Sequence, residues 1–207
     1  MAVVVRKPTV ITFIDIPKTA STSIASWLVE HAGGFQFLKR HTTCRKMQNV
    51  YKDVGHTFCV IRNPWDRMVS YYHHHIFKLT SNIQEVTDHA GEHPRHKDKD
   101  YQIDHCEMVL NHLSKGFKFF IQNFDQWGWS SWSKQQQHWT EGVDQILRYE
   151  SLDHDFVSIQ RMIGCAIPLP NLNVGSHRDY KTYYDQETID IVAKHFATDI
   201  ALFNYNY

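Results

Sequence analysis

The stretch Ile11-Thr-Phe-Ile-Asp-Ile-Pro-Lys-Thr-Ala-Ser-Thr-Ser-Ile-Ala-Ser-Trp-Leu28 decides the fold of this chain, because it joins a strand, a tight turn and a helix. Residues 9–15 are apolar and β-branched enough to predict a buried strand, which Pro17 ends. From Thr22 onward the apolar residues recur with the spacing of an amphipathic helix. They are Ile24, Trp27, Leu28 and Ala32.

The turn between this strand and this helix consists of Lys18, Thr19, Ala20, Ser21, Thr22 and Ser23. A helix start presents backbone N–H groups without intrahelical partners, together with the positive end of the helix dipole. Small side chains let an anion reach these groups, the hydroxyls add donors, and Lys18 adds a positive charge. The turn is therefore a candidate phosphate cradle, although the pattern G-x-x-x-x-G-K-[ST] is absent. The alternative is an ordinary turn with hydroxyl capping.

A second stretch, Thr57-Phe-Cys-Val-Ile-Arg-Asn-Pro-Trp-Asp-Arg-Met-Val-Ser-Tyr71, repeats the order of strand and helix. Asn63 suits the helix cap, and Ser70 lies about two turns further on, so both lie on one helix face. Arg62, at the carboxyl end of the strand, can join Ser70 around a second anion. The alternatives are a salt bridge from Arg62 to Asp66 and a solvated position for Ser70.

These two stretches carry a resemblance to a known family. The run Ile16-Pro-Lys-Thr-Ala-Ser-Thr-Ser23 resembles the 5′-phosphosulfate loop of sulfotransferases that use 3′-phosphoadenosine 5′-phosphosulfate (PAPS). The run Val60-Ile-Arg-Asn-Pro-Trp-Asp-Arg-Met-Val-Ser-Tyr-Tyr72 resembles their 3′-phosphate motif. The first run is most similar to the heparan sulfate and uronyl 2-O-sulfotransferases, and the second is similar to short soluble members. Weaker similarity continues in residues 146–152 and 199–205.

The resemblance implies a donor and a set of donor contacts. PAPS would be the donor and 3′-phosphoadenosine 5′-phosphate (PAP) the product, with no metal required. Lys18 would neutralise charge on the leaving phosphate, and residues 19–23 would grip that phosphate. Arg62 and Ser70 would hold the 3′-phosphate. The loop of residues 169–180 is similar to a family stretch that closes over the nucleotide, and its candidate contacts are Ser176, Arg178 and Tyr180.

The resemblance also implies a histidine base, which takes the proton of an acceptor hydroxyl on a glycan or a small molecule. In the family this histidine lies in the region of His41, which here precedes a predicted helix start at Thr42 or Thr43. An intrinsic pKa near ~6.5 suits histidine to this task. The alternative bases are His73 and His75 on the second helix, and the alternative role for His41 is that of a surface residue.

Length and composition predict a single domain over residues 1–207. We expect an α/β, three-layer, P-loop-like domain with a mainly parallel central sheet flanked by helices, and ligands at the carboxyl ends of the strands. Lys plus Arg and Asp plus Glu number 22 each, which argues against a nucleic-acid partner. Four scattered cysteines suit a reducing compartment without requiring one. Oligomeric state stays open.

The sequence shows little sign of a membrane-spanning segment or of a metal-binding motif. No signal peptide or membrane-spanning segment is evident, so we expect a cytoplasmic protein without a membrane partner. The Golgi lumen would follow only if an anchor had been removed from the chain. The run His73-His74-His75 points its rings in different directions around a helix and does not make a metal site by itself.

The segment of residues 124–139 is rich in tryptophan, with Trp127, Trp129, Trp132 and Trp139 among serines and glutamines. Tryptophan in a polar context suits sugar binding, and it equally suits packing under a loop. Two functional alternatives to sulfuryl transfer remain at this stage. One is a P-loop-type nucleotide kinase, and the other is a noncatalytic glycan- or nucleotide-binding protein on the same fold.

Overall fold

The structure is a computed structural model that describes residues 2–5, 9–37, 41–51, 53–74, 114–124, 133–170, 172 and 178–207. Several sequence predictions lie outside these residues. They concern Ser176, His75 and three of the tryptophans, Trp127, Trp129 and Trp132.

Five strands form one sheet in the order β3-β1-β2-β4-β5. Their bounds are Ala2–Val5 for β1, Ile11–Ile14 for β2, Phe35–Phe37 for β3, His56–Ile61 for β4 and Gln145–Arg148 for β5. Strands β2, β4 and β5 are parallel, whereas β1 runs antiparallel to both β2 and β3. The α/β class is thus confirmed, but the expectation of a mainly parallel sheet is wrong for half of the pairings. Only residues 6–10 link β1 to β2, and so short a connection permits antiparallel pairing alone.

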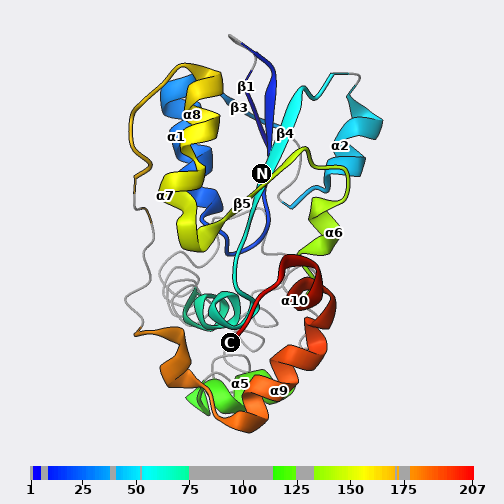
Figure 1. Cartoon of the computed structure of the whole chain (residues 1–207), viewed down its shortest axis with the longest axis vertical. Helices are drawn as coiled ribbons and strands as arrows, with labels where there is room; N and C mark the ends of the chain where they lie inside the picture. The colour runs from blue at the N-terminus through cyan, green and yellow to red at the C-terminus, as the bar shows by residue number, and fades with distance from the viewer. Residues whose placement is uncertain are drawn as a thin grey trace, which may run out of the picture.

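Helices cover both faces of this sheet (Figure 1). On one face lie α1 (Ser21–Ala32), α7 (Leu152–Asp155) and α8 (Val157–Ile163). On the other lie α2 (Cys44–Val50), α6 (Gln137–Thr140) and α10 (Ala197–Phe203). Successive strand residues face opposite sides of the sheet, so each buried strand contributes side chains to the hydrophobic core on either face.

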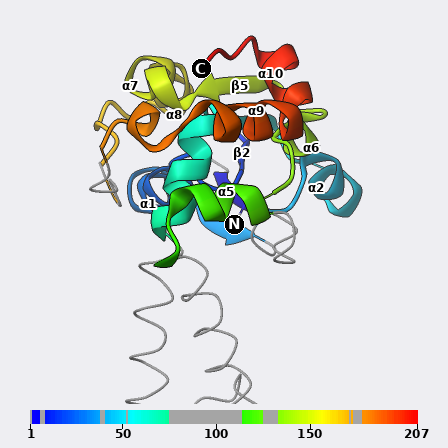
Figure 2. The same ribbon diagram turned by 90° about the horizontal axis from the view of Figure 1, so that it is seen from below.

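The helix that follows β4, here called the post-β4 helix, is described over residues 64–74. With α5 (Phe117–Asn123) and α9 (Gln186–His195) it lies across the carboxyl ends of the strands, as Figure 2 shows from below. An aromatic core of Trp65, Tyr71, Tyr72, Phe117, Phe120, Phe124 and Phe196 holds these helices together. This layer closes one side of the space into which β2 and β4 run.

The caps of the helices follow the sequence closely. Thr43 caps α2 by accepting a hydrogen bond from Lys46 N, and Gly33 ends α1 with a φ of 61°. Asn63 Oδ1 accepts from Trp65 N at 3.0 Å, which starts the post-β4 helix. Within the described residues, no helix has the length and apolar character needed to cross a membrane.

Candidate active site

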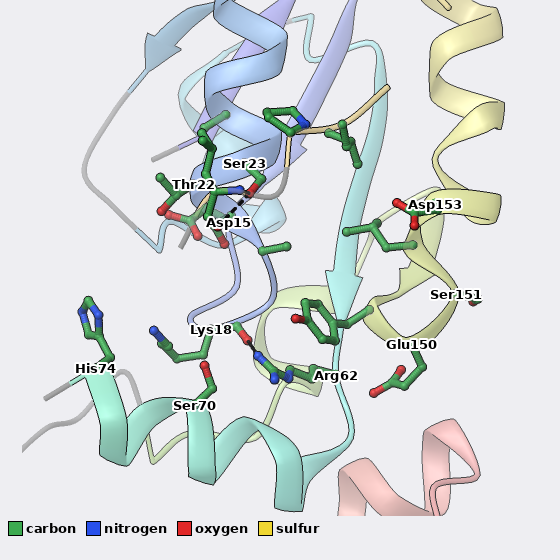
Figure 3. A pocket seen from close by; sticks show the side chains of 18 of the residues that line it. Asp15, Lys18, Thr22, Ser23, Arg62, Ser70, His74, Glu150, Ser151 and Asp153 are labelled. Carbon is green, nitrogen blue, oxygen red and sulfur yellow. Dashed lines mark hydrogen bonds between the residues drawn. The ribbon is translucent and has the colours of Figure 1, made fainter. Parts of the chain in front are cut away.

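A pocket of about 530 Å³ opens where β2 and β4 end (Figure 3). Its walls come from the β2–α1 turn, the post-β4 helix, the segment after β5 and the residues near position 170. Most of the predicted site residues line it, namely Lys18, Ala20, Ser21, Thr22, Ser23, His41, Arg62 and Ser70. The two strand ends that the sequence singled out therefore meet at one cavity.

The β2–α1 turn has a backbone conformation that non-glycine residues seldom adopt. Lys18 has a φ of 67° and Ala20 a φ of 65°, both in the left-handed region. Such residues cost roughly 1–2 kcal/mol each relative to ordinary conformations. Ala20 also serves as the N-cap of α1 without any capping side chain. The start of α1 thus follows a strained turn beside the pocket, and strained backbone clusters at functional sites.

Three of the turn hydroxyls bind backbone carbonyls. Thr19 Oγ1 and Ser21 Oγ both donate to Ile16 O, at 3.0 and 2.7 Å, and Ser23 Oγ donates to Leu172 O at 3.1 Å. Thr19 is fully buried behind the turn and does not line the pocket. These hydroxyls therefore shape the turn, and the backbone N–H groups of α1 are the donors that could serve an anion.

Arg62 lines the pocket although it is only 5% exposed. Its Nε donates to Asp66 Oδ2 at 2.7 Å, and its Nη1 donates to Lys18 O at 3.3 Å. The guanidinium carbon lies 3.9 Å from the centre of the Tyr149 ring. The salt bridge from Arg62 to Asp66, which the sequence offered as an alternative to anion binding, is present. Arg62 nevertheless still lines the pocket. The two contacts use two of the five guanidinium N–H groups.

His41 also lines the pocket, with a left-handed φ of 61°. Its Nδ1 lies 3.4 Å from Asp15 Oδ2 and 3.3 Å from Asp15 O. The backbone carbonyl of His41 accepts a hydrogen bond from Trp139 Nε1 at 2.9 Å. Burial raises the pKa of the Asp15 carboxyl, but the hydrogen bond and charge of His41 oppose it, and the net pKa lies below the ordinary value.

Two further lining residues, Asp15 and His74, were not singled out from the sequence as site residues. Figure 3 shows Ser70 and His74 rising from the post-β4 helix toward Lys18. The spacing could have found His74, because it lies one helical turn beyond Ser70 and so shares its face. Its neighbour His73 instead contacts Tyr183 OH at 2.9 Å.

A third missed residue, Glu150, follows β5 and lines the opposite side of the pocket (Figure 3). Its Oε1 accepts from Asn63 N at 2.6 Å, and its Oε2 accepts from Tyr205 OH at 3.2 Å. Glu150 therefore ties the strand end after β5 to the start of the post-β4 helix.

The residues near the C-terminus that were predicted to close over the nucleotide do not join the other predicted site residues at the pocket. Arg178 and Tyr180 are described, but neither lines the pocket. Tyr180 begins a short 3-10 helix, Tyr180–Tyr183, and packs edge-on against Tyr207 at 5.8 Å between ring centres. Trp139 is buried in the core against α2 and α10, so packing explains this tryptophan.

The chain is thus an α/β protein in which two parallel strands each run into a helix start, and a lysine and an arginine from these two junctions line one pocket. A family model described as the sulfotransferase family matches residues 1–206, so the chain belongs to that family, which is PAPS-dependent and includes heparan sulfate 2-O-sulfotransferase-like members. The comparison with curated proteins and the comparison with solved structures each found no match.

Membership confirms the resemblance drawn from the two motifs and identifies a PAPS-dependent sulfotransferase enzyme. Sulfuryl transfer in general, with PAPS as donor, PAP as product and a hydroxyl-bearing acceptor, follows from the family. Membership of this family therefore argues against both alternatives, the P-loop-type nucleotide kinase and the noncatalytic binding protein. Among the residues that the structure describes, no three His, Cys, Asp or Glu side chains gather as a metal site would require.

Proposed function

We propose that this pocket holds PAPS and that the chain transfers its sulfuryl group to the hydroxyl of a glycan or a small molecule. One observation carries the proposal, namely that the Lys18 turn and the Arg62–Ser70 helix face line the same cavity. A volume of about 530 Å³ suits a ligand of nucleotide size. We also propose a P-loop-like, three-layer arrangement, supported by the strand–turn–helix order of β2 and α1 and by the helices on both faces of the sheet.

The two proposed phosphate subsites differ in their chemistry. At the first, the N-terminal amides of α1 and the charge of Lys18 would hold the 5′-phosphate. At the second, Arg62 and Ser70 would hold the 3′-phosphate, with the arginine held in place by Asp66 and by the Tyr149 ring. Apolar residues of the pocket walls could meet the flat face of a base, namely Tyr149, Leu152, Leu169, Pro170 and Leu172.

Lys18 is the residue to which we assign stabilisation of the leaving group. When bound, PAPS supplies a sulfuryl group joined to a phosphate that can leave. Like phosphoryl transfer, such a reaction needs fixed positive charge where negative charge builds. Lys18 would hold its ammonium group at that place, supported by the left-handed turn on which it lies.

His41 is the residue to which we assign the acceptor proton. Donation of Nδ1–H to Asp15 would fix one tautomer, and the lone pair would then reside on Nε2. His41 would take the hydroxyl proton at Nε2 as the acceptor oxygen bonds to sulfur. Asp15 would stabilise the imidazolium that results, in the manner of a buried carboxylate behind a histidine base. His74 is the competing candidate, because it lines the same pocket.

The proposal is tested by a screen with donor labelled in the sulfuryl sulfur. Wild-type protein is offered glycans, phenols and small alcohols, and label in each acceptor is counted after separation from the donor. We expect transfer to at least one class and its loss in Lys18→Ala. Label transfer that Lys18→Ala leaves unchanged would remove Lys18 from the mechanism. Donor binding without transfer to any class would contradict a role in sulfation of these hydroxyls.

A further inference from the structure

Arg67 is a buried cation that the proposed reaction does not use. It is only 2% exposed, and burial lowers the pKa of its guanidinium to about 10, with the charge of Asp199 opposing this shift. The arginine therefore stays charged at neutral pH. Burying a charge is costly unless contacts compensate it, so the contacts of Arg67 indicate what it is there to hold.

Those contacts lead from the post-β4 helix to the turn of the first anion subsite. Arg67 Nε donates to Pro17 O at 3.0 Å, and Nη1 donates to Lys134 O at 3.1 Å. Arg62, five residues earlier, donates from Nη1 to Lys18 O at 3.3 Å, the contact drawn as a dashed line in Figure 3. Two consecutive carbonyls of the turn, those of Pro17 and Lys18, are thus each bound by an arginine of the second motif.

This turn needs support from outside itself. Lys18 and Ala20 both have left-handed φ values, and strained conformations persist only where their surroundings enforce them. The turn hydroxyls supply part of that support through Ile16 O. They fasten the turn to its own strand, whereas the arginines fasten it to the helix that carries the other subsite.

The backbone of Arg62 is itself held in place by buried polar groups. The side-chain amide of Gln136 accepts from Arg62 N at 2.9 Å and donates to Arg62 O at 2.8 Å. Asp199 accepts from the backbone N–H groups of Gln136 and Gln137 at 2.6 and 2.9 Å. The backbone at Arg62 is therefore fixed from behind, so the contact at Lys18 O is made from a rigid base.

We infer that Arg67 is a positioning residue for Lys18, and that Arg67 and Arg62 together brace the 5′-phosphate turn against the helix that reads the 3′-phosphate. Arg67 itself touches no ligand in this account, since it does not line the pocket. The inference rests on the proposed donor site. It implies that damage at Arg67 weakens the 5′-phosphate subsite and spares the 3′-phosphate subsite.

The test uses two ligands that each fill one subsite. Calorimetry measures the affinity of full-length wild type and Arg67→Lys for adenosine 5′-monophosphate and for adenosine 3′-monophosphate. Lysine keeps the charge but cannot bind Pro17 O and Lys134 O as a planar fork. We expect the 5′-monophosphate affinity to fall about tenfold or more and the 3′-monophosphate affinity to change less than about twofold.

The matched control is Arg148→Lys. Arg148 also donates to a backbone carbonyl, that of Phe203, and lies outside the pocket lining. We expect it to change neither affinity. Equal losses for the two nucleotides in Arg67→Lys would show a general structural role and overturn the inference. Wild type that binds neither nucleotide nor PAP would instead refute the donor site itself.

A measurement on the wild type keeps the test decisive if Arg67→Lys does not fold. Saturating adenosine 3′-monophosphate fills the Arg62 subsite, and hydrogen exchange is then followed in the peptide covering residues 16–23. If the two subsites are braced together, exchange in this peptide slows. Unchanged exchange despite calorimetrically confirmed binding would overturn the inference.

Discussion

Replacement of Arg62 by alanine tests the assignment of the 3′-phosphate subsite. Arg62 is 5% exposed and fixed by the 2.7 Å salt bridge to Asp66 and by the Tyr149 ring at 3.9 Å. A phosphate bound to it would therefore meet a desolvated, preoriented guanidinium. Truncating one partner of such a charge pair costs about 2–5 kcal/mol, which weakens binding roughly 30- to 5000-fold.

The assay compares PAP with adenosine 5′-monophosphate by calorimetry. In Arg62→Ala, PAP should lose about 2–5 kcal/mol of binding free energy. The 5′-monophosphate lacks the 3′-phosphate and should lose no more than about 0.5–1.5 kcal/mol, the worth of the hydrogen bond to Lys18 O. The preference of the wild type for PAP should therefore largely disappear.

Two controls separate binding from folding in this experiment. Arg62→Ala leaves the half-buried Asp66 carboxylate without its salt bridge, which costs less stability than the roughly 3–5 kcal/mol of a fully buried pair. The double variant Arg62→Ala/Asp66→Asn removes that charge and should show the same ligand pattern. Arg45→Ala, at an exposed ion pair, should change nothing. Unchanged PAP affinity, or equal losses for both nucleotides, would refute the role given to Arg62.

The remaining predictions concern catalysis and acid stability. Lys18→Ala should lower turnover far more than donor affinity, and a variant with normal turnover and only a raised donor requirement would show Lys18 to be a binding residue alone. His41→Ala should lower turnover about 10²–10⁴-fold while PAP binding persists, and loss confined to His74→Ala would move the base to the post-β4 helix. Asp15 has a folded pKa below its ordinary 3.8, so its stabilisation is present above that value and is lost as the pH falls through the folded pKa. The difference in unfolding free energy between wild type and Asp15→Asn should therefore shrink as the pH falls from about 5 through the lowered folded pKa, and a constant difference would contradict the pairing with His41.

The strand–turn–helix order at both motifs could be predicted from the sequence, because local signals carry it. The apolar run that became β2, the helical spacing after Thr22 and the cap at Asn63 all act within a few residues. The placement of β1 was predicted less well. Its antiparallel pairing with β2 follows from the short link of residues 6–10, whereas its pairing with β3 depends on a segment that lies beyond α1 in the sequence.

The residue types of the site could be predicted, but their contacts could not. Small hydroxylated residues in the turn suggested ligand donors, yet Thr19 and Ser21 bind Ile16 O, since a strained turn needs internal support. His41 was found by its position before a helix, whereas its neighbour Asp15 looked like an ordinary strand end. Arg67 was seen only as part of a motif, because its partner Pro17 lies fifty residues earlier.

We propose that this pocket recognises the PAPS nucleotide through two phosphate subsites, and the nucleotide preference of the wild type is the sharpest test of this recognition. Calorimetry is performed with PAP, adenosine 5′-monophosphate and ATP under one set of conditions. PAP should bind far more tightly than either of the other two, because under the proposal it alone would place phosphates at both Lys18 and Arg62, which line one pocket. Equal affinity for PAP and adenosine 5′-monophosphate, or tighter binding of ATP, would contradict the account.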